Sequence, residues 1–459
     1  MFIINSYYKL RNVVFFLGEG FLIFMSLVVV DWYILGSTLF YLDLPMNSAR
    51  ALLVTGVFLL CLYFFDLYNV NGDLTIPNTF TRMVQSFGVG CVILAAIYYI
   101  VPYMIINTKI FLIGYVGICL TVILWRGGYY FILRNRYFVQ DVLVVGTGAL
   151  AADIAREVEG VPDSVHRICG FVGTGQPSFN PYKAPVRPRL EDYEELFRRH
   201  KLQRIVVALD DPRGETPVQT LLKYKMRGFF IEQGVNFFER LTGKILVEKV
   251  PPSWIIYSDG FRSSRVTHLL KRTVDLISAI SLFVITLPVL TLTAILIKLE
   301  SPGPIFYTQE RVGEKNRPFR VIKFRSMRQD AEKDGAVWAA ENDPRVTRVG
   351  AVIRQLRIDE LPQLINIFKG EMSLVGPRPE RKVFIDELVK KIPFYDIRHE
   401  LRPGVTGWAQ VCYPYGASEH DALKKLEYDL YYMKNLSLAF DFLIIFKTAK
   451  TILAREGSR

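Results

Sequence analysis

The sequence has few cysteines, and none is spaced to bind a metal. Its 459 residues contain five of them, Cys61, Cys91, Cys119, Cys169 and Cys412, and no pair has CxxC spacing. Three lie in strongly apolar stretches, where cysteine behaves as a small hydrophobic residue. We therefore expect neither a disulfide framework nor a zinc site. The sequence also has no internal repeat and no low-complexity tract.

The N-terminal stretch 1–35 is apolar but lacks the small-residue cleavage site of a signal peptide. It is the first of four apolar segments in residues 1–137, three of which reach the ~20 residues that a spanning helix needs. The segment at 51–65 is short for a span. The four segments are 13–35, 51–65, 83–103 and 110–133. They predict a retained, four-helix transmembrane region.

Basic residues are distributed unevenly around these segments. Lys9, Arg11, Arg82, Arg126, Arg134 and Arg136 lie on one predicted side. The two loops on the other side contain only Arg50 and Lys109. Because cytoplasmic loops are enriched in Lys and Arg, this distribution predicts that both ends of the chain are cytoplasmic.

Residues 138–240 alternate buried strand patterns with helical patterns, which predicts a Rossmann-like α/β domain. Gly146, Gly148 and Ala151 follow the first strand as in a dinucleotide fingerprint. However, the strand near 168–172 ends in Gly-Thr-Gly, without the acidic residue that binds a ribose. This favours the interpretation that the glycines only allow a tight strand-to-helix turn in a structural or regulatory domain, although a ligand of this domain stays open.

A linker is predicted at 241–268, followed by a last domain at 269–459. This domain begins with an apolar helix at 274–297, which has Lys271 and Arg272 before it and Lys298 after it. Pro288 interrupts this helix, and proline bends helices because it lacks an N–H donor. With basic residues at both ends, we expect a re-entrant hairpin kinked at Pro288. An ordinary span is the alternative.

Asp359 and Glu360 form the first candidate site, in the segment Arg-Ile-Asp-Glu-Leu-Pro-Gln-Leu. Pro362 suits a first helical turn and Gly370 suits a helix end, so the two carboxylates are expected at a helix N-terminus. The positive end of a helix favours anions. An acidic helix cap with no chemical role is the alternative for this motif.

Cations near this segment predict an anionic substrate. The formal net charge of +12 alone does not separate nucleic acid, anionic lipid and a phosphorylated substrate. Lys323 and Arg325 alternate on a predicted strand and therefore share one face. Arg354 precedes the Asp-Glu pair, and Arg378 lies in a stiff Gly-Pro-Arg-Pro-Glu loop. Ordinary solvated charges and rigid turns remain the alternatives.

The stretch from about 271 to 453 resembles the bacterial sugar transferases, the monotopic polyprenyl-phosphate phosphoglycosyl transferases. The resemblance rests on ordered motifs: Ser301-Pro-Gly-Pro304, Lys323-Phe-Arg-Ser-Met327, Asp343-Pro-Arg345, the Asp359-Glu360 segment, Met372–Glu380 and Arg402–Val411. The four spans and the α/β domain resemble the long forms that prime exopolysaccharide or O-antigen synthesis. One departure is Leu287 before Pro288, where some members have serine.

The resemblance implies a mostly α, monotopic catalytic domain on the cytoplasmic face of the bacterial inner membrane. It implies transfer of a sugar-1-phosphate from a UDP-sugar to undecaprenyl phosphate, with release of UMP. Asp359 would be the nucleophile, Glu360 a ligand of Mg²⁺, and Lys323, Arg325, Arg354 and Arg378 the phosphate clamps. Membrane lipid is an implied partner and nucleic acid is not. The sugar, the pathway and homo-oligomerisation stay open.

Two other functions are compatible with parts of the sequence. A membrane-bound nucleotide-sugar oxidoreductase would use the Gly146 motif, but it would need a Tyr-x-x-x-Lys motif. The middle domain has no such motif, because Val186, Phe197 and Gly228 stand four residues after its tyrosines. A non-catalytic scaffold for polysaccharide export would have no need of carboxylates beside phosphate-binding cations.

Overall fold

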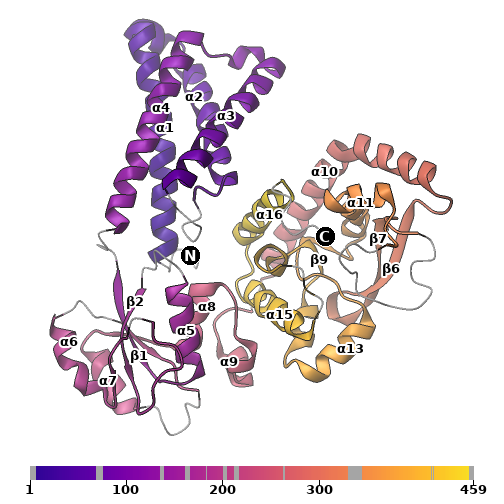
Figure 1. Cartoon of the computed structure of the whole chain (residues 1–459). Coiled ribbons are helices and arrows are strands. Elements are labelled where there is room, and N and C mark those ends of the chain that lie inside the picture. The colour runs from indigo at the N-terminus through magenta and orange to yellow at the C-terminus, as the bar shows by residue number, and fades with distance from the viewer. Residues whose placement is uncertain are drawn as a thin grey trace. The chain divides into compact units, whose positions relative to one another are not determined.

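The computed structural model describes residues 7–68, 76–134, 139–160, 166–181, 183–199, 204–210, 217–261, 264–328, 344–414, 416 and 418–453. Asp343 and Arg136, both used above, lie outside these ranges. The chain divides into two compact units, Met1–Gly234 and Val235–Arg459 (Figure 1).

Four long helices open the first unit: α1 (Tyr7–Leu42), α2 (Leu44–Phe64), α3 (Ile76–Ile100) and α4 (Thr108–Arg134). Each contains a segment long and apolar enough to cross a membrane. The segment that looked short in the sequence is a helix of 21 residues, because α2 begins earlier, with a proline in its first turn. That all four cross the bilayer remains a prediction.

An ion pair lies inside this helical bundle. Glu19 of α1 is fully buried, and its carboxylate accepts from Arg126 Nη2 at 2.8 Å and lies 2.7 Å from Arg126 Nε. The Tyr68 hydroxyl donates to the same carboxylate, and Arg126 also donates to the Leu67 carbonyl at 2.7 Å. Arg126 is therefore a partner of Glu19 within α4.

The remainder of the first unit is the expected α/β domain. Its five strands form a parallel sheet in the order β3-β2-β1-β4-β5, with helices packed against it (Figure 1). The strands are β1 (Gln140–Val145), β2 (His166–Val172), β3 (Val186–Arg187), β4 (Arg204–Val207) and β5 (Phe230–Gln233). The helices are α5 (Ala149–Glu159), η2 (Leu190–Tyr193), α6 (Glu194–Arg199) and α7 (Val218–Met226).

A carboxylate of the chain itself caps the glycine turn of this domain. Asp210, just beyond β4, accepts from the backbone N–H groups of Ala149 and Leu150 at 2.8 and 3.0 Å. A Cβ atom at Gly148 would lie 2.0 Å from Asp210 Oδ2. The N-terminus of α5 is the position where Rossmann domains hold a pyrophosphate. In this chain Asp210 occupies it.

The second unit is mostly helical. Its helices are α8 (Gly234–Thr242), η3 (Val247–Lys249), α9 (Pro252–Tyr257), α10 (Arg265–Glu300), η4 (Glu314–Asn316), α11 (Arg348–Gln355), η5 (Ile358–Gln363), α12 (Leu364–Lys369), α13 (Lys382–Lys391), η6 (Tyr395–Glu400), α14 (Trp408–Cys412), α15 (Glu419–Lys434) and α16 (Leu438–Leu453). An antiparallel hairpin joins β6 (Phe306–Val312) and β7 (Pro318–Phe324), and a parallel pair joins β8 (Ser373–Val375) and β9 (Gly404–Thr406). These two small sheets frame the site described below.

The segment expected to be a linker, 241–268, is part of this folded unit. Ile245, Val247 and Val250 are buried in its main hydrophobic core together with residues of α13 and α15. The Ile245 N–H also donates to the Glu427 carbonyl at 3.0 Å. The linker prediction is therefore wrong for these residues, because their apolar side chains pack against helices that are distant in sequence.

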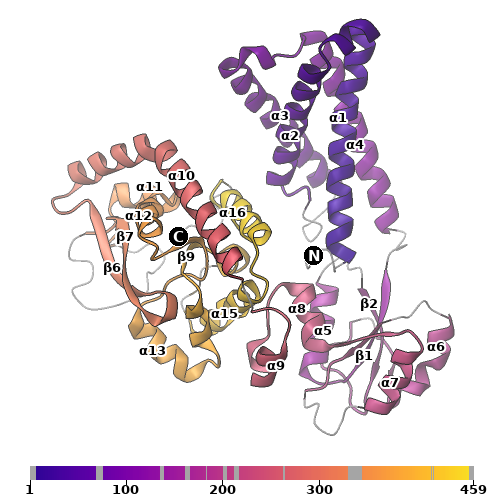
Figure 2. The ribbon, with the colours of Figure 1, turned by 180° about the vertical axis from the view of Figure 1, so that it is seen from behind.

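Helix α10 is a single helix of 36 residues with Pro288 in its interior, and Figure 2 shows that it bends along its length. Both of its ends contact the same unit. Near its start, Asp275 accepts from Ser373 Oγ at 2.8 Å and from Leu374 N at 3.1 Å. At its end, Ile297 packs in a small core with residues of β7 and α11, and Glu300 accepts from Val349 N at 3.1 Å.

Candidate active site

The Asp-Glu pair lies in a short 3₁₀ helix, as its local sequence predicts. Arg357 has a left-handed backbone (φ 58°), and η5 begins directly after it with Asp359 and Glu360 in its first turn. Pro362 lies inside η5, and α12 ends at Gly370 with φ 82°. The expected helix start and helix end are both confirmed, and both carboxylates are buried.

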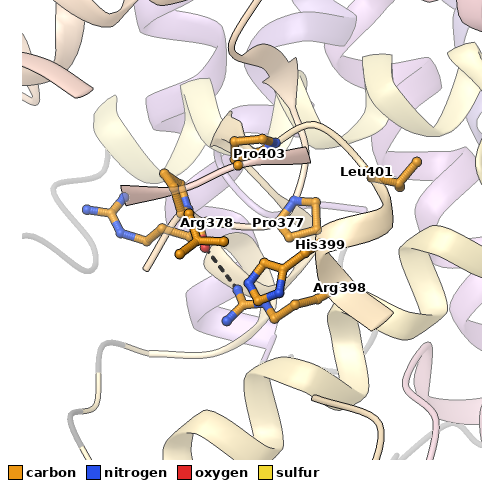
Figure 3. Close-up of a pocket in the computed structure, with 9 residues that line it drawn as sticks. Pro377, Arg378, Arg398, His399, Leu401 and Pro403 are labelled. Atoms are coloured by element: carbon orange, nitrogen blue, oxygen red, sulfur yellow. Dashed lines mark hydrogen bonds between the residues drawn. The ribbon is translucent and has the colours of Figure 1, made fainter. Parts of the chain in front are cut away.

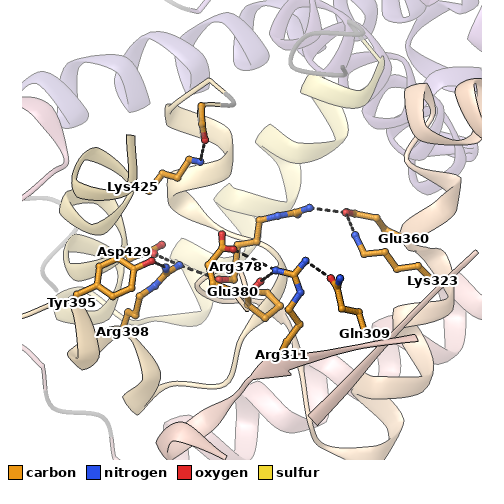
Figure 4. A network of polar contacts seen from close by, with 12 residues as sticks. Gln309, Arg311, Lys323, Glu360, Arg378, Glu380, Tyr395, Arg398, Lys425 and Asp429 are labelled. Atoms are coloured by element: carbon orange, nitrogen blue, oxygen red, sulfur yellow. Dashed lines mark hydrogen bonds and ion pairs between the residues drawn. The ribbon is translucent and has the colours of Figure 1, made fainter. Parts of the chain in front are cut away.

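Two cations converge on Glu360. Lys323 Nζ from β7 donates to Glu360 Oε1 at 2.7 Å, and Arg378 Nη2 donates to the same oxygen at 2.9 Å (Figure 4). Burial alone would raise the pKa of Glu360. The charges of Arg378 and Lys323 outweigh burial and hold this pKa well below its usual range, so Glu360 is an anion at neutral pH.

Asp359 is in a different environment. Within the described residues, no hydrogen bond or ion pair engages its carboxylate, although its exposed fraction is only 9%. Burial, and then the charge of Glu360, raise the pKa of Asp359 to about 6, while Lys323, Arg354 and Arg357 oppose this rise. The result is a buried, unpaired carboxylate that is ionised above about pH 6. Such a group is suited to nucleophilic attack.

The structure brings together three of the four candidate phosphate clamps. Lys323 and Arg378 meet at Glu360, and Arg354 on α11 is close enough for its charge to lower the pKa of Asp359. Arg325 does not join them. Its guanidinium is buried and donates to the carbonyls of Pro302 and Ser301, each at 2.8 Å. The strand β7 ends at Phe324, so the alternation argument does not extend to Arg325.

A second group of polar residues, near Arg378, was not identified as a site by the sequence analysis (Figure 4). Arg311 of β6 contacts Glu380 Oε2 at 3.3 Å and donates to Gln309 Oε1 at 2.6 Å. Arg398 of η6 forms an ion pair with Asp429 of α15 at 2.9 Å. These residues are far apart in sequence and belong to no local chemical pattern. Of these residues, Glu380 alone stands within a motif named in the sequence analysis, Met372–Glu380.

A small pocket lies against the Arg378 loop (Figure 3). It is lined by Pro377, Arg378, His399 and Pro403, among others, and neither Asp359 nor Glu360 contributes to it. Burial, and then the charge of Arg398, lower the pKa of His399, which is therefore neutral at physiological pH.

The donor set at η5 fits Mg²⁺. Among the described residues there is no group of three or more His, Cys, Asp or Glu side chains that could enclose a metal ion. Magnesium, however, commonly binds through one or two carboxylates and completes its shell with water and substrate phosphates. Asp359 and Glu360 are adjacent hard oxygen donors of this kind, with the Asp359 oxygens unengaged among the described side chains.

Two family profiles match the chain. The bacterial sugar transferase profile matches residues 266–455, which contain the whole site described above. A profile of a CoA-binding domain matches residues 64–224, which include the parallel sheet up to β4. The described parallel sheet is consistent with the second match.

Named relatives agree with the first profile. The chain is 48% identical over 221 residues to the UDP-N-acetylgalactosamine-undecaprenyl-phosphate N-acetylgalactosaminephosphotransferase of Aeromonas hydrophila, covering 48% of this chain and 52% of that protein. It is 33% identical over 324 residues to the undecaprenyl-phosphate glucose phosphotransferase of Komagataeibacter xylinus, covering 69% of this chain and 59% of that protein. The matches thus span about half to three fifths of these two relatives.

A third relative is matched over most of its length. The UDP-glucose:undecaprenyl-phosphate glucose-1-phosphate transferase of Caulobacter vibrioides is 40% identical over 192 residues, which are 41% of this chain and 72% of that protein. With the profile match over the site and this coverage, the chain belongs to the bacterial sugar transferase family of polyprenyl-phosphate phosphoglycosyl transferases.

Proposed function

We propose that the protein transfers a sugar-1-phosphate from a UDP-sugar to undecaprenyl phosphate, as the first membrane step of exopolysaccharide or O-antigen synthesis. The observation that supports this most strongly is the contrast within the Asp-Glu pair. Asp359 is buried and has no hydrogen-bond or ion-pair partner among the described residues, whereas Glu360 is held by two cations. A transferase that forms a covalent intermediate needs one free carboxylate beside a region of positive charge.

The reaction proceeds in two displacements. In the first, an oxygen of Asp359 attacks the β-phosphorus of the UDP-sugar, and the bond from that phosphorus to the bridging oxygen breaks. UMP leaves with the bonding electron pair. In the second, an oxygen of undecaprenyl phosphate attacks the same phosphorus, and the Asp359 carboxylate is released. The product is a sugar joined to undecaprenol through a diphosphate.

The residues around Asp359 neutralise the charge of the reacting groups. Lys323 and Arg378 lie within 3 Å of Glu360, and the charge of Arg354 acts on Asp359. All three cations would therefore be near a diphosphate bound beside Asp359. Glu360, with Asp359 beside it, would hold Mg²⁺. When bound, this ion offsets part of the negative charge of the diphosphate. Arg325 supports the end of α10 and is not included among the clamps.

We also propose that α10 enters the cytoplasmic face of the bacterial inner membrane and returns to it. A straight helix of 36 residues would be about 54 Å long. It would carry its two ends to opposite sides of a bilayer core of about 30 Å. Asp275 and Glu300 both bond to the same folded unit, which supports a bent course. This arrangement would hold the site at the level of the lipid phosphates.

The direct test is release of UMP by the purified protein in nanodiscs with undecaprenyl phosphate and Mg²⁺. The relatives include phosphotransferases named for N-acetylgalactosamine and for glucose, so both UDP-sugars belong in the panel, with UDP-galactose and UDP-N-acetylglucosamine. We expect UMP and a lipid-linked sugar diphosphate from at least one donor. Turnover of NAD(P) without UMP release would instead support a nucleotide-sugar oxidoreductase.

A further inference from the structure

Residues 376–380 form the loop that carries Arg378, called here the Arg378 loop. Hydrogen bonds hold its backbone at every carbonyl from Pro377 to Glu380. Each of the four carbonyls accepts a hydrogen bond from another segment of the same unit. The donors are Gly404 N to Pro377 at 2.9 Å, Arg398 Nη2 to Arg378 at 3.0 Å, Arg311 Nη1 to Pro379 at 3.3 Å and Val312 N to Glu380 at 3.0 Å. The two prolines further restrict this backbone. Of these donors, Arg398 is the one that binds the residue whose side chain reaches Glu360.

Arg398 is itself fixed by two partners. Its side chain is 5% exposed and forms an ion pair at 2.9 Å with Asp429, whose side chain is 2% exposed. Nη1 donates to the Tyr395 hydroxyl at 2.6 Å. Figure 4 shows Asp429 and Tyr395 beside the guanidinium, and Figure 3 shows the bond from Arg398 to the Arg378 carbonyl. A rigid chain of contacts therefore runs from Asp429 through Arg398 and Arg378 to Glu360.

A buried ion pair of this kind is a poor way to stabilise a fold. Removing two charges from water costs more than their attraction returns in many proteins, and apolar replacements are often neutral or stabilising. In keeping with this cost, burial raises the pKa of Asp429 to about 6 despite the adjacent Arg398. Aliphatic side chains could fill the same space. What they could not supply is a donor to the Arg378 carbonyl.

We propose that Arg398 and Asp429 are positioning residues for the transfer reaction, which fix the Arg378 backbone so that its guanidinium is aimed at Glu360 and the substrate diphosphate. Asp429 acts by orienting Arg398, and neither residue touches the substrate. The proposal rests on the proposed function for its kinetic consequence. Its structural consequence, an immobile Arg378 loop, does not depend on that function.

The test compares a double variant, Arg398→Met/Asp429→Leu, with the wild type in nanodiscs. The variant removes both charges and keeps the apolar volume, so we expect its thermal midpoint to be equal or higher. We expect kcat/KM for the UDP-sugar to fall at least tenfold, with hydrogen exchange of the peptide 376–381 clearly accelerated. Lys434→Met/Glu239→Leu is the matched control, because this ion pair, 2.7 Å apart, is also nearly buried in the same unit but does not bond to the loop.

Each outcome is decisive. A stable double variant with wild-type kcat/KM and unchanged exchange would overturn the proposal, and so would an equal kinetic loss in the control. If the wild type releases no UMP, the proposed function fails, and the exchange measurement alone then decides whether the pair holds the loop. If the double variant does not fold, Asp429→Asn, which keeps the side-chain shape, is compared with Glu239→Gln by the same two readouts.

Discussion

Asp359 and Glu360 are consecutive and equally buried, yet two cations bind the carboxylate of Glu360 and no described side chain binds that of Asp359. Their order along a 3₁₀ turn directs the two side chains to different surroundings. This division indicates different roles, with Asp359 available for bond formation and Glu360 fixed in place.

Replacement of Asp359 by asparagine should abolish transfer. Asparagine keeps the shape but lacks the carboxylate oxygen that would form the acyl phosphate, so we expect a loss on the order of 10⁴-fold or more, as for other covalent nucleophiles. The thermal midpoint should change little, because asparagine is also tolerated at a helix start. Mass spectrometry after incubation with the UDP-sugar alone should find a sugar-phosphate adduct on the wild-type peptide containing Asp359.

The control for this variant is Asp386→Asn, which alters an exposed carboxylate on α13 and should leave the rate unchanged. Near-normal activity of Asp359→Asn, or an adduct on a different peptide, would remove Asp359 from the mechanism.

Glu360→Gln should impair the response to magnesium. The amide keeps the shape but has a weaker oxygen ligand, and it leaves Lys323 and Arg378 without their anion. We expect a rate loss of about 100-fold and a higher Mg²⁺ concentration for half-maximal activity. Chelation with EDTA should stop the wild type, and Mg²⁺ should restore it. An unchanged Mg²⁺ dependence in Glu360→Gln would exclude Glu360 as a ligand.

The re-entrant course of α10 predicts that residues before and after it are on one side of the membrane. Single cysteines at Ser253 and Thr308, in a chain whose five native cysteines are replaced, should both react only with a reagent on the cytoplasmic side. Lys109→Cys, in the first turn of α4, should react only from the opposite side. Labelling of Thr308→Cys together with Lys109→Cys would instead make α10 a fifth span.

The start of the catalytic unit can be located by truncation. A chain beginning at Val235 keeps Ile245, Val247 and Val250 in the core, and we expect transfer within about tenfold of the full chain, since the α/β domain supplies no residue to the proposed reaction. A chain beginning at Phe261 loses these side chains, each contributing roughly 1.5–3 kcal/mol. It should have a much lower thermal midpoint. Equal midpoints would contradict the structural role of residues 241–257.

The pH dependence of stability should report the burial of Asp429. Burial, and to a lesser extent the charge of Glu380, raise the pKa of Asp429 from 3.8 when unfolded to about 6 when folded, while the charges of Arg398 and Lys425 oppose this rise. This difference favours folding below pH 4, and the benefit is lost as the pH rises through 6. Relative to Asp429→Asn, the wild type should therefore gain on the order of 1 kcal/mol of stability between pH 7.5 and pH 5. Thermal unfolding at both pH values measures the difference in stability between the two proteins. If this difference is the same at pH 7.5 and pH 5, the raised pKa is contradicted.

Local chemistry explains which parts of the site the sequence could predict. Asp359, Glu360 and the helix around them follow from a proline in an early turn and a glycine at the end, all within twelve residues of one another. The parallel sheet could also be predicted, because strand and helix patterns alternate along residues 138–240. The Arg398–Asp429 pair could not be predicted, because only the packing of η6 against α15 brings these residues together.

The two structural corrections have a related cause. Arg325 was grouped with Lys323 by strand alternation, but β7 stops one residue before it, and the end of α10 provides carbonyl acceptors that no local pattern reveals. The second correction concerns residues 241–268, which the sequence analysis predicts to be a linker. Their apolar side chains acquire partners only when α13 and α15 are folded beside them.

The position of Asp210 has a consequence for how the α/β domain can respond to metabolites. A tethered carboxylate competes with any free anion for the N–H groups of Ala149 and Leu150, at an effective concentration of roughly millimolar or higher. A coenzyme at micromolar levels would have to overcome this internal competitor before its phosphates could bind. The tethered Asp210 carboxylate thus weakens the binding of any phosphate-bearing ligand at the N-terminus of α5.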